Sequence, residues 1–345
     1  MNLPKFFGID IGKKSIKIAQ VQQAEKNPKV LRLLSFDTGD GLLTSEDASQ
    51  RSELAIRIKD AVNGAKIDTN KCVVALPEPS IFNRLLTFPD MEEKALNEAI
   101  HWNAKQFLPV AVDDVQKDWI KTAEVEKDGK KMIQLLLVAA PKKLINNTLD
   151  IFRQADLDLI AIETESVASS RAIANSYGDT GSILVIDIGA AGTDMSVVNE
   201  GKLIFSQSLG TGSDAMTRGI MTGFSLEESQ AEQYKQKFGL LQNQGEGKIF
   251  QVLQPVASII SAEVTKTINF FRTKYAQSTP QKVLLIGEGA KLPGISEYLS
   301  GNLGIPVEIA NLSNNLSFDG EAQKESDNRG LFSYGVALGL ALKKE

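Results

Sequence analysis

The chain has 345 residues, enough for two domains of ordinary size, and 42% apolar and 23% charged residues, as in a globular protein. Its formal net charge of −5 argues against a nucleic-acid-binding surface, because such surfaces are normally basic. The single cysteine excludes an internal disulfide and fits a reducing compartment. No apolar stretch approaches the roughly 20 residues of a transmembrane helix, and the N-terminal segment is too short for a signal peptide. We therefore expect a cytoplasmic protein.

The first part of the chain predicts an antiparallel meander of strands, then a helix and a further strand. Alternating apolar residues indicate the strands, and apolar residues that recur every three or four positions indicate the helix. Pro77 and Pro79 end the last strand. The expected elements are strands over 6–11, 15–22 and 30–37, a helix over 51–64 and a strand over 72–76.

Residues 81–158 have a pattern of their own, which predicts an inserted β-α-β-β subdomain followed by a helix. Asp90 and Glu93 have the spacing of a capping box at the start of its first helix. Asp128-Gly129 is a strong hairpin signal between its two later strands. The expected elements are a strand over 82–88, a helix over 91–108, strands over 115–125 and 132–139 and a helix over 141–155.

The rest of the chain alternates strands and helices again. Ser225 and Glu228 have capping-box spacing, and Pro255 predicts a kink in a long helix. The polar segment 311–329 is expected to be mobile. The expected elements are a strand over 159–162, a helix over 166–177, a hairpin around 185–193, a strand over 203–207, a helix after 212, helices over 225–239 and 249–277, a strand over 283–286 and a helix over 330–344.

One turn occurs twice, as Asp10-Ile11-Gly12 and as Asp187-Ile188-Gly189. Each copy follows an apolar run and precedes a second alternating run, which predicts a β-hairpin with a carboxylate beside its tip. Gly allows the tight backbone, and consecutive amides at such a tip can bind an anion. Two facing tips would hold a polyphosphate from both sides, and Asp10 and Asp187 would serve its divalent metal. We therefore expect an internally duplicated α/β protein with a cleft between two lobes.

Two glycine-rich turns and three charged residues are further candidates for this cleft. Gly210-Thr211-Gly212 and Gly287-Glu288-Gly289 each connect a strand to a helix and would let a ligand approach the backbone, although ordinary turns have the same pattern. Glu232 and Lys235 share one helix face and would bind vicinal hydroxyls and cover an aromatic base, or else form a solvated ion pair. Glu165 would orient an attacking water, or else lie exposed at a helix start.

Together these motifs resemble the actin/Hsp70/sugar-kinase ATPase superfamily over nearly the whole chain. The resemblance implies an α/β actin-like ATPase fold, with two duplicated lobes around a nucleotide cleft, that binds ATP and Mg²⁺. It places Asp10 and Asp187 at the metal, through water, and a small-residue helix with Gly335 and Gly339 where the lobes cross. The other nucleotide-binding residues that it implies are Gly12, Lys13, Lys14, Ser15, Lys17, Gly189, Ala190, Ala191, Gly192, Thr193, Gly210, Thr211, Gly212, Glu232, Lys235, Gly287, Glu288 and Gly289.

The resemblance also implies four subdomains. These are a first-lobe core over 1–80 and 159–180 (IA), an SHS2-like insert over 81–158 (1C), a second-lobe core over 181–215 and 279–345 (IIA), and a helical cap over 216–278 (IIB).

Within this superfamily the segments 99–109, 113–115 and 118–119 of the insert resemble the PilM family. Its members are cytoplasmic actin-like proteins of type IV pilus assembly, related to FtsA. FtsA-like proteins continue into an amphipathic membrane-targeting helix, whereas this sequence stops at Glu345 after its last core helix, which favours PilM. The family implies that the N-terminal cytoplasmic tail of PilN, an inner-membrane protein, docks between the first-lobe core and the insert. The protein would then lie at the inner-membrane face only through its partners.

The resemblance leaves the pilus motor ATPase, the platform protein and a second copy of the chain open as further partners, and it implies no nucleic acid.

His101, the only histidine, is expected to pack on the insert helix rather than to catalyse. Ala190 and Ala191 in the second turn, and Glu288 where a Gly is common, argue against fast ATP hydrolysis. Two alternatives remain: an FtsA-like filament protein at the membrane, and a small-molecule kinase of the same superfamily.

Overall fold

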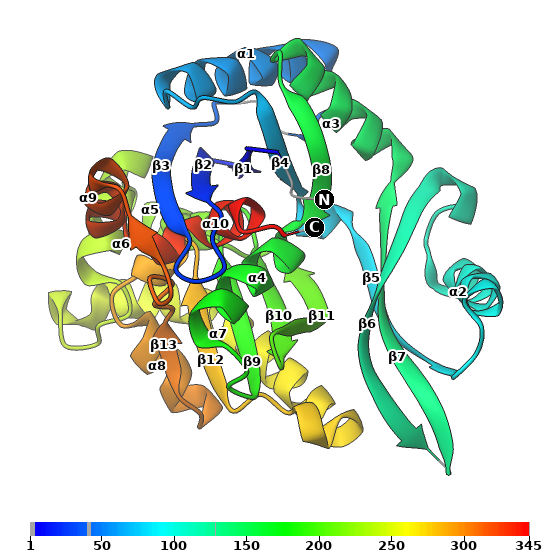
Figure 1. Cartoon of the computed structure of the whole chain (residues 1–345). Helices are drawn as coiled ribbons and strands as arrows, with labels where there is room; N and C mark the ends of the chain where they lie inside the picture. The colour runs from blue at the N-terminus through cyan, green and yellow to red at the C-terminus, as the bar shows by residue number, and fades with distance from the viewer. Residues whose placement is uncertain (1–3, 40–42, 128, 345) are drawn as a thin grey trace.

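The structure, a computed structural model, describes residues 4–39, 43–127 and 129–344 and contains two large sheets of matching topology (Figure 1). The first sheet contains β1 (Phe7–Ile11), β2 (Ser15–Gln22), β3 (Lys29–Asp37), β4 (Lys71–Leu76), β8 (Asp158–Thr164) and β14 (Ser317–Phe318). The second contains β9 (Ser182–Ile188), β10 (Thr193–Asn199), β11 (Lys202–Leu209), β12 (Lys282–Ile286) and β13 (Val307–Ile309).

The strand order shows an internal duplication. The order β3-β2-β1-β4-β8 of the first sheet recurs as β11-β10-β9-β12-β13 in the second. In each sheet the first three strands of the order are antiparallel neighbours, and the other pairs are parallel. The prediction of two duplicated lobes is therefore confirmed.

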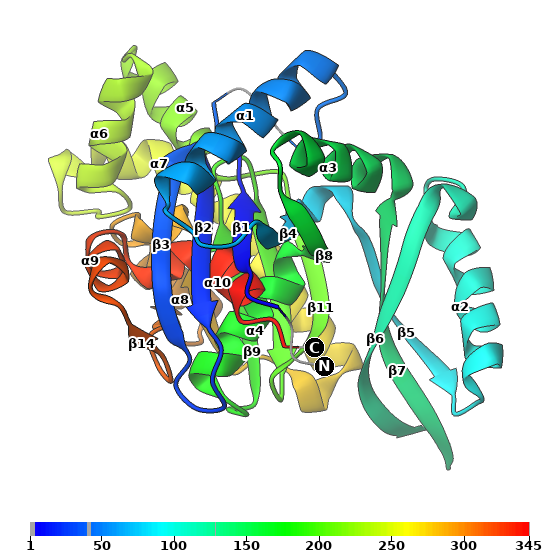
Figure 2. The same ribbon diagram turned by 45° about the horizontal axis from the view of Figure 1, so that its top comes forward.

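Two helices, α4 (Glu165–Tyr177) and α10 (Gly335–Ala341), lie between the two sheets (Figure 2). Their apolar residues share one core with residues of both sheets, such as Val21 and Ile286. The crossing is very close, because a Cβ added to Gly339 would lie 1.8 Å from the carbonyl oxygen of Ala168. The predicted small-residue helix therefore occupies the place where the lobes meet.

Other helices cover the outer faces of the lobes. In the first lobe, residues such as Ile58 and Phe152 from α1 (Ala48–Gly64) and α3 (Lys142–Gln154) pack against the strands. The second lobe packs against α5 (Ser213–Phe224), α6 (Glu228–Phe238), α7 (Lys248–Lys274) and α8 (Ile295–Leu303). None of the helices in the described ranges combines the length and the apolar character that crossing a membrane requires.

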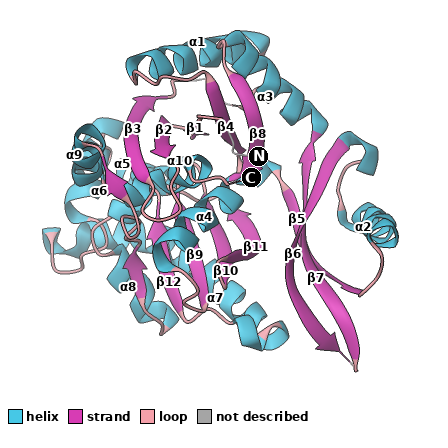
Figure 3. Cartoon of the chain, viewed as in Figure 1, coloured by secondary structure: helices cyan, strands magenta, loops and turns pink. Residues whose placement is uncertain are grey.

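The insert stands to one side of the two lobes (Figure 3). It is an antiparallel sheet in the order β5-β7-β6, with one helix packed on it. The helix α3 falls within the predicted range of the insert, but it packs into the first-lobe core. The hairpin position Asp128 lies outside the described residues. The elements of the insert are β5 (Phe82–Pro89), α2 (Glu93–Phe107), β6 (Val115–Lys127) and β7 (Lys130–Pro141).

Three local predictions are wrong. Ser225 has φ +52° and ends α5 instead of capping the next helix, and α2 begins after Glu92 without a side-chain cap. The segment 311–329, predicted to be mobile, contains β14, which pairs with β3, and a helix, α9 (Gly320–Arg329). Asp319 caps α9 by accepting a hydrogen bond from the amide of Gly320.

Candidate functional site

A cleft of about 570 Å³ lies between the two lobes, and both copies of the duplicated turn contribute to it. The first lobe supplies one wall, through the β1–β2 turn and the start of α4. The second lobe supplies the other wall. The predicted residues that line the cleft are Asp10, Gly12, Lys13, Lys14, Ser15, Lys17, Glu165, Asp187, Gly189, Ala190, Glu232, Lys235, Gly287, Glu288 and Gly289.

The two turns have the same hydrogen bond. The amide of Gly12 donates to the carbonyl of Ser15 at 3.0 Å, and the amide of Gly189 donates to Gly192 at 2.9 Å. The amides of the two residues inside each turn (13, 14, 190 and 191) donate to no other backbone carbonyl of the described residues. Each turn therefore offers amides to an anion, as the sequence pattern predicts.

The second turn is fastened to the start of α5. The amide of Ser213 donates to the carbonyl of Gly189 at 2.9 Å, and a Cβ added to Gly212 would lie 2.5 Å from the carbonyl oxygen of Ala190. The Thr193 hydroxyl donates to the carbonyl of Thr211 at 2.7 Å. These contacts hold the second turn against the segment that leads into α5. The predicted residues outside the cleft lining are Ala191, Gly192, Thr193, Gly210, Thr211 and Gly212, of which Gly210 lines a separate hollow beside the insert.

Four carboxyl groups with raised pKa values line the cleft. Burial raises the pKa of Asp187 to about 6, although Lys17 partly offsets it, and burial raises the pKa of Asp194 to about 8. Burial also raises the pKa of Asp10, with Lys17 opposing. Burial and the nearby charges of Asp194 and Asp10 raise the pKa of Glu165 well above its usual value. A cation entering the cleft would stabilise the ionised form of all four.

The arrangement of these carboxylates suits a hydrated cation. In the described part of the chain, no three His, Cys, Asp or Glu side chains are grouped closely enough to bind a metal ion directly. The Asp194 side chain keeps one buried oxygen that has no hydrogen-bond partner among the described residues. Magnesium commonly retains several waters and uses one or two carboxylates with phosphate oxygens. The donor set of the cleft therefore fits a phosphate-bearing ligand accompanied by a divalent cation.

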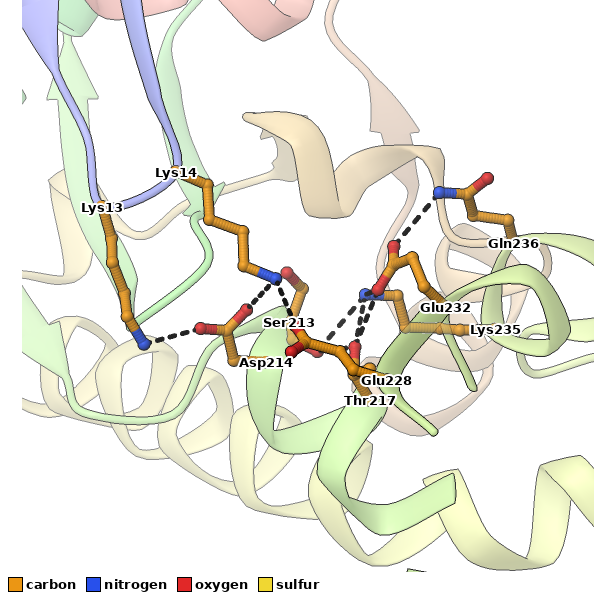
Figure 4. A network of polar contacts seen from close by, with 9 residues as sticks. All are labelled: Lys13, Lys14, Ser213, Asp214, Thr217, Glu228, Glu232, Lys235 and Gln236. Carbon is orange, nitrogen blue, oxygen red and sulfur yellow. Dashed lines mark hydrogen bonds and ion pairs between the residues drawn. The ribbon is translucent and has the colours of Figure 1, made fainter. Parts of the chain in front are cut away.

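Lysines from the first lobe reach across the cleft. Lys13 Nζ lies 2.7 Å and Lys14 Nζ 2.9 Å from the carboxylate of Asp214 in the first turn of α5 (Figure 4). Burial alone would raise the pKa of Asp214, but its bonds to these two lysines outweigh burial and lower it. Lys17 is buried and donates to the carbonyl of Ser333 at 2.7 Å. The first turn and the start of β2 thus carry three ammonium groups into or across the cleft.

Glu232 and Lys235 belong to a network that joins α6 to α5 (Figure 4). Lys235 Nζ lies 2.8 Å from Glu232 Oε2 and 2.9 Å from the hydroxyl of Thr217. The side chain of Lys235 is only 9% exposed, so this pair is not the solvated ion pair of the alternative. After β12 of the same lobe, Glu288 pairs with Lys291 at 2.6 Å.

Glu165 is connected to a residue that the sequence analysis missed. Its Oε2 accepts a hydrogen bond from the backbone amide of Glu78 at 2.7 Å. Glu78 itself is buried, and burial raises its pKa. Glu165 therefore lies in the cleft rather than exposed at the helix start.

Two other residues of the site also escaped the sequence analysis. Asp194 lies opposite Asp187 in the β9–β10 pair, in the position that Lys17 has opposite Asp10 in the β1–β2 pair. Asp194 follows Asp187 by seven residues, as Lys17 follows Asp10, so an alignment of the two copies would have identified it. Asp214 and Glu78 carry no such signal, because their partners are brought to them only by the fold.

Comparison with known proteins identifies the family of this chain from residue 8 onward. The family model described as type IV pilus assembly protein PilM matches residues 8–345. Among solved structures, a PilM–PilN type IV pilus biogenesis complex superposes with a TM-score of 0.84 and 25% sequence identity, and the match covers 98% of each chain. EutJ, an ethanolamine utilization protein from Carboxydothermus hydrogenoformans, has a TM-score of 0.57 and 18% identity, covering 99% of this chain and 90% of EutJ.

Among curated proteins, the cell division protein FtsA of Bacillus subtilis (strain 168) is 24% identical over 277 residues, which are 72% of this chain. The chain spans 62% of the length of that relative. Taken with the strand order, these matches show that the fold is the predicted actin-like α/β fold.

Proposed function

Because this chain belongs to the family of the type IV pilus assembly protein PilM, we propose that it is a scaffold of the inner-membrane assembly platform of a type IV pilus. In this role it docks the N-terminal cytoplasmic tail of a PilN-type protein. The observation that carries the proposal is the superposition on the PilM–PilN complex, which covers 98% of each chain at a TM-score of 0.84. The chain would lie at the cytoplasmic face of the inner membrane through this partner.

The ligand proposed for the cleft is ATP with Mg²⁺. Support comes from the free amides of the two turns, from the ammonium groups of Lys13 and Lys14, and from the carboxylates of Asp10 and Asp187. Mg²⁺ would neutralise phosphate charge between the two carboxylates. Glu232 and Lys235 lie on the α6 side of the same cleft, where the nucleoside would extend.

The same residues argue for slow hydrolysis at most. Glu165 is the candidate base, and a general base needs an oxygen that is available within hydrogen-bond reach of the attacking water. Glu165 Oε2 already accepts the Glu78 amide. We therefore assign the nucleotide a regulatory role, in which it stabilises a closed arrangement of the lobes. Binding shifts that equilibrium only by the difference in nucleotide affinity between the two arrangements.

The docking groove was predicted between the first-lobe core and the insert. The hollow that the described residues form beside the insert, of about 700 Å³, lies between the insert and the second lobe. It is lined by aromatic side chains from both sides, including Phe82, Phe107, Phe205 and Phe270. An insert that faces both lobes would present a different surface when the lobes close.

The proposal is tested with a synthetic peptide that carries the N-terminal cytoplasmic segment of the PilN-type protein encoded with this chain. Fluorescence anisotropy of the labelled peptide is measured against the full chain, with and without Mg-ATP. Saturable binding is expected, together with a shift in affinity when Mg-ATP is added. Absence of binding under both conditions contradicts the scaffold role and leaves only the fold.

Two further assays on the purified full chain test the two alternative functions. An FtsA-like filament protein would sediment with ATP and liposomes in the absence of a partner. A small-molecule kinase would release ADP only when its substrate is added. We expect neither result.

A further inference from the structure

Glu78 occupies a junction between three parts of the molecule. It begins a short 3₁₀ helix (Glu78–Ser80) that connects β4 of the first lobe to β5 of the insert. This segment and β5 both contact β11, the edge strand of the second-lobe sheet. The residue is only 2% exposed, although a carboxylate is costly to bury without partners.

The Glu78 carboxylate accepts hydrogen bonds from each neighbouring part. The hydroxyl of Ser206 on β11 donates to Oε1 at 2.6 Å, and Asn83 Nδ2 on β5 donates to the same oxygen at 3.3 Å. The backbone amide of Ser166, at the start of α4, donates to Oε2 at 3.2 Å. The Ser206 hydroxyl donates here, and the Asn83 Nδ2 group and the Ser166 amide can only donate, so both carboxylate oxygens act as acceptors. A glutamine would turn its amide group toward one of these donors.

The backbone of the same residue is bonded to the cleft. Its amide donates to Glu165 Oε2 at 2.7 Å, and Glu165 lines the cleft beside Asp10 and Asp194. A continuous path therefore runs from a cleft carboxylate, through Glu78, to both the insert and the second lobe. The contacts on either side of Glu78 are direct hydrogen bonds, one to its backbone amide and three to its carboxylate.

We propose that Glu78 is a positioning residue that couples occupancy of the cleft to the position of the insert against the second lobe. The inference rests on the proposed function in one respect, that Mg-ATP is the ligand of the cleft. A ligand that changes the charge around Glu165 changes how firmly Glu165 holds the Glu78 amide. Ser206 and Asn83 then carry this change to β11 and β5. Because coupling between sites is reciprocal, a partner that moves the insert would change the affinity for Mg-ATP by the same factor.

The test compares three variants of the full chain by hydrogen exchange with mass spectrometry, with and without Mg-ATP. Ser206→Ala removes only the bond to the second lobe, Glu78→Gln disturbs the whole junction, and Glu163→Gln is the control. Glu163 is also a poorly exposed carboxylate, on β8, but its partners are Arg171 and Lys343, and it lines neither the cleft nor the insert hollow.

In the unaltered chain, Mg-ATP is expected to slow exchange in β5 and β11 as well as in the cleft turns. In Ser206→Ala and Glu78→Gln, the protection of the cleft turns should persist while the change in β5 and β11 falls by at least half. Glu163→Gln should behave like the unaltered chain. Ser206→Ala decides the result if Glu78→Gln does not fold.

Two results overturn the inference while the proposed function stands. Either Mg-ATP protects the cleft without any change in β5 and β11, or Ser206→Ala transmits the change fully. Failure of the unaltered chain to bind Mg-ATP by calorimetry overturns the proposed function, and the inference with it.

Discussion

Asp194 occupies in the second turn the position that Lys17 has in the first. The two hairpins have the same backbone pairing, but the residue opposite the repeated Asp is a lysine in the first lobe and a second aspartate in the other lobe. In the absence of a cation, Asp187 and Asp194 are held close together beside Asp10, and this proximity is unfavourable when they are ionised. This charge distribution supports the proposed ligand, which carries both phosphate and a divalent cation.

Asp194→Asn should stabilise the ligand-free protein at high pH. The pKa of Asp194 is raised from 3.8 to about 8, so the folded state binds a proton that the unfolded state releases between these values. Stability from this group is therefore full below about pH 4 and is lost as the pH rises toward 8. We expect the variant to gain about 1–3 kcal/mol at pH 9, the usual cost of a poorly satisfied buried polar group, and little at pH 4, where the carboxyl group is protonated in the folded state. Urea denaturation at the two pH values measures the difference, and an equal gain at both would contradict the assignment.

Asp214→Asn should tighten the binding of Mg-ATP. Asp214 holds Lys13 and Lys14, which a phosphate group would otherwise contact. The two lysine side chains are 46% and 48% exposed, so each ion pair is worth about 1 kcal/mol or less, and its removal should improve affinity about two- to fivefold. Glu228→Gln is the control, because among the described residues the Glu228 carboxylate pairs with Lys14 alone, at 3.3 Å, and its side chain is more exposed than that of Asp214. Weaker binding by Asp214→Asn in calorimetry would mean that Asp214 contacts the ligand itself.

At the scale of the elements, the strands and helices with strong apolar periodicity were predicted correctly. The expected strands over 6–11, 15–22 and 283–286 match β1, β2 and β12 to within one residue at each end. These elements bury apolar residues on a regular face, and that regularity is what a single sequence displays. The helix α9 was missed because Ala322 is its one buried residue and its neighbour β3 lies far away in the sequence.

Turn chemistry misled the prediction at Ser225. Serine and glutamate three residues apart are typical of a helix start, yet Ser225 adopts a left-handed conformation and ends α5. The preference of serine for a helix N-terminus is overridden here. The junction between α5 and α6 is set instead by packing on the second-lobe sheet and by the hydrogen bond between Thr217 and Lys235.

Gly339→Ala should destabilise the protein strongly. The added Cβ would lie 1.8 Å from the carbonyl oxygen of Ala168, so α10 must move away from α4 and open the core shared by both lobes. We expect a loss of about 3 kcal/mol or more, at the upper end of the usual cost of overpacking. Gly301→Ala in α8 is the matched control, because no atom lies within 4 Å of its added Cβ and alanine is the better helix former. Thermal unfolding of both variants checks the contrast, and equal melting temperatures would contradict the packing argument.

At the scale of the whole molecule, the duplication made the architecture and the centre of the site predictable. The repeated Asp-x-Gly turns predicted two lobes that face one cleft, and both Asp10 and Asp187 line it. The sequence could not predict the residues whose role depends on contact between different parts of the fold. Asp214 meets Lys13 across 201 positions, and Glu78 meets Ser206 across 128. Such pairs have no spacing rule, so only the folded chain reveals them.

The central claim is that Asp10 and Asp187, one from each lobe, serve a single Mg-ATP. Isothermal titration calorimetry of Mg-ATP into the full chain tests it directly, with Asp10→Asn and Asp187→Asn compared with the unaltered chain. We predict one site per chain and an affinity at least tenfold weaker in each variant, equivalent to about 1.4 kcal/mol or more. Unchanged affinity in both variants, or a stoichiometry other than one nucleotide per chain, would contradict the account.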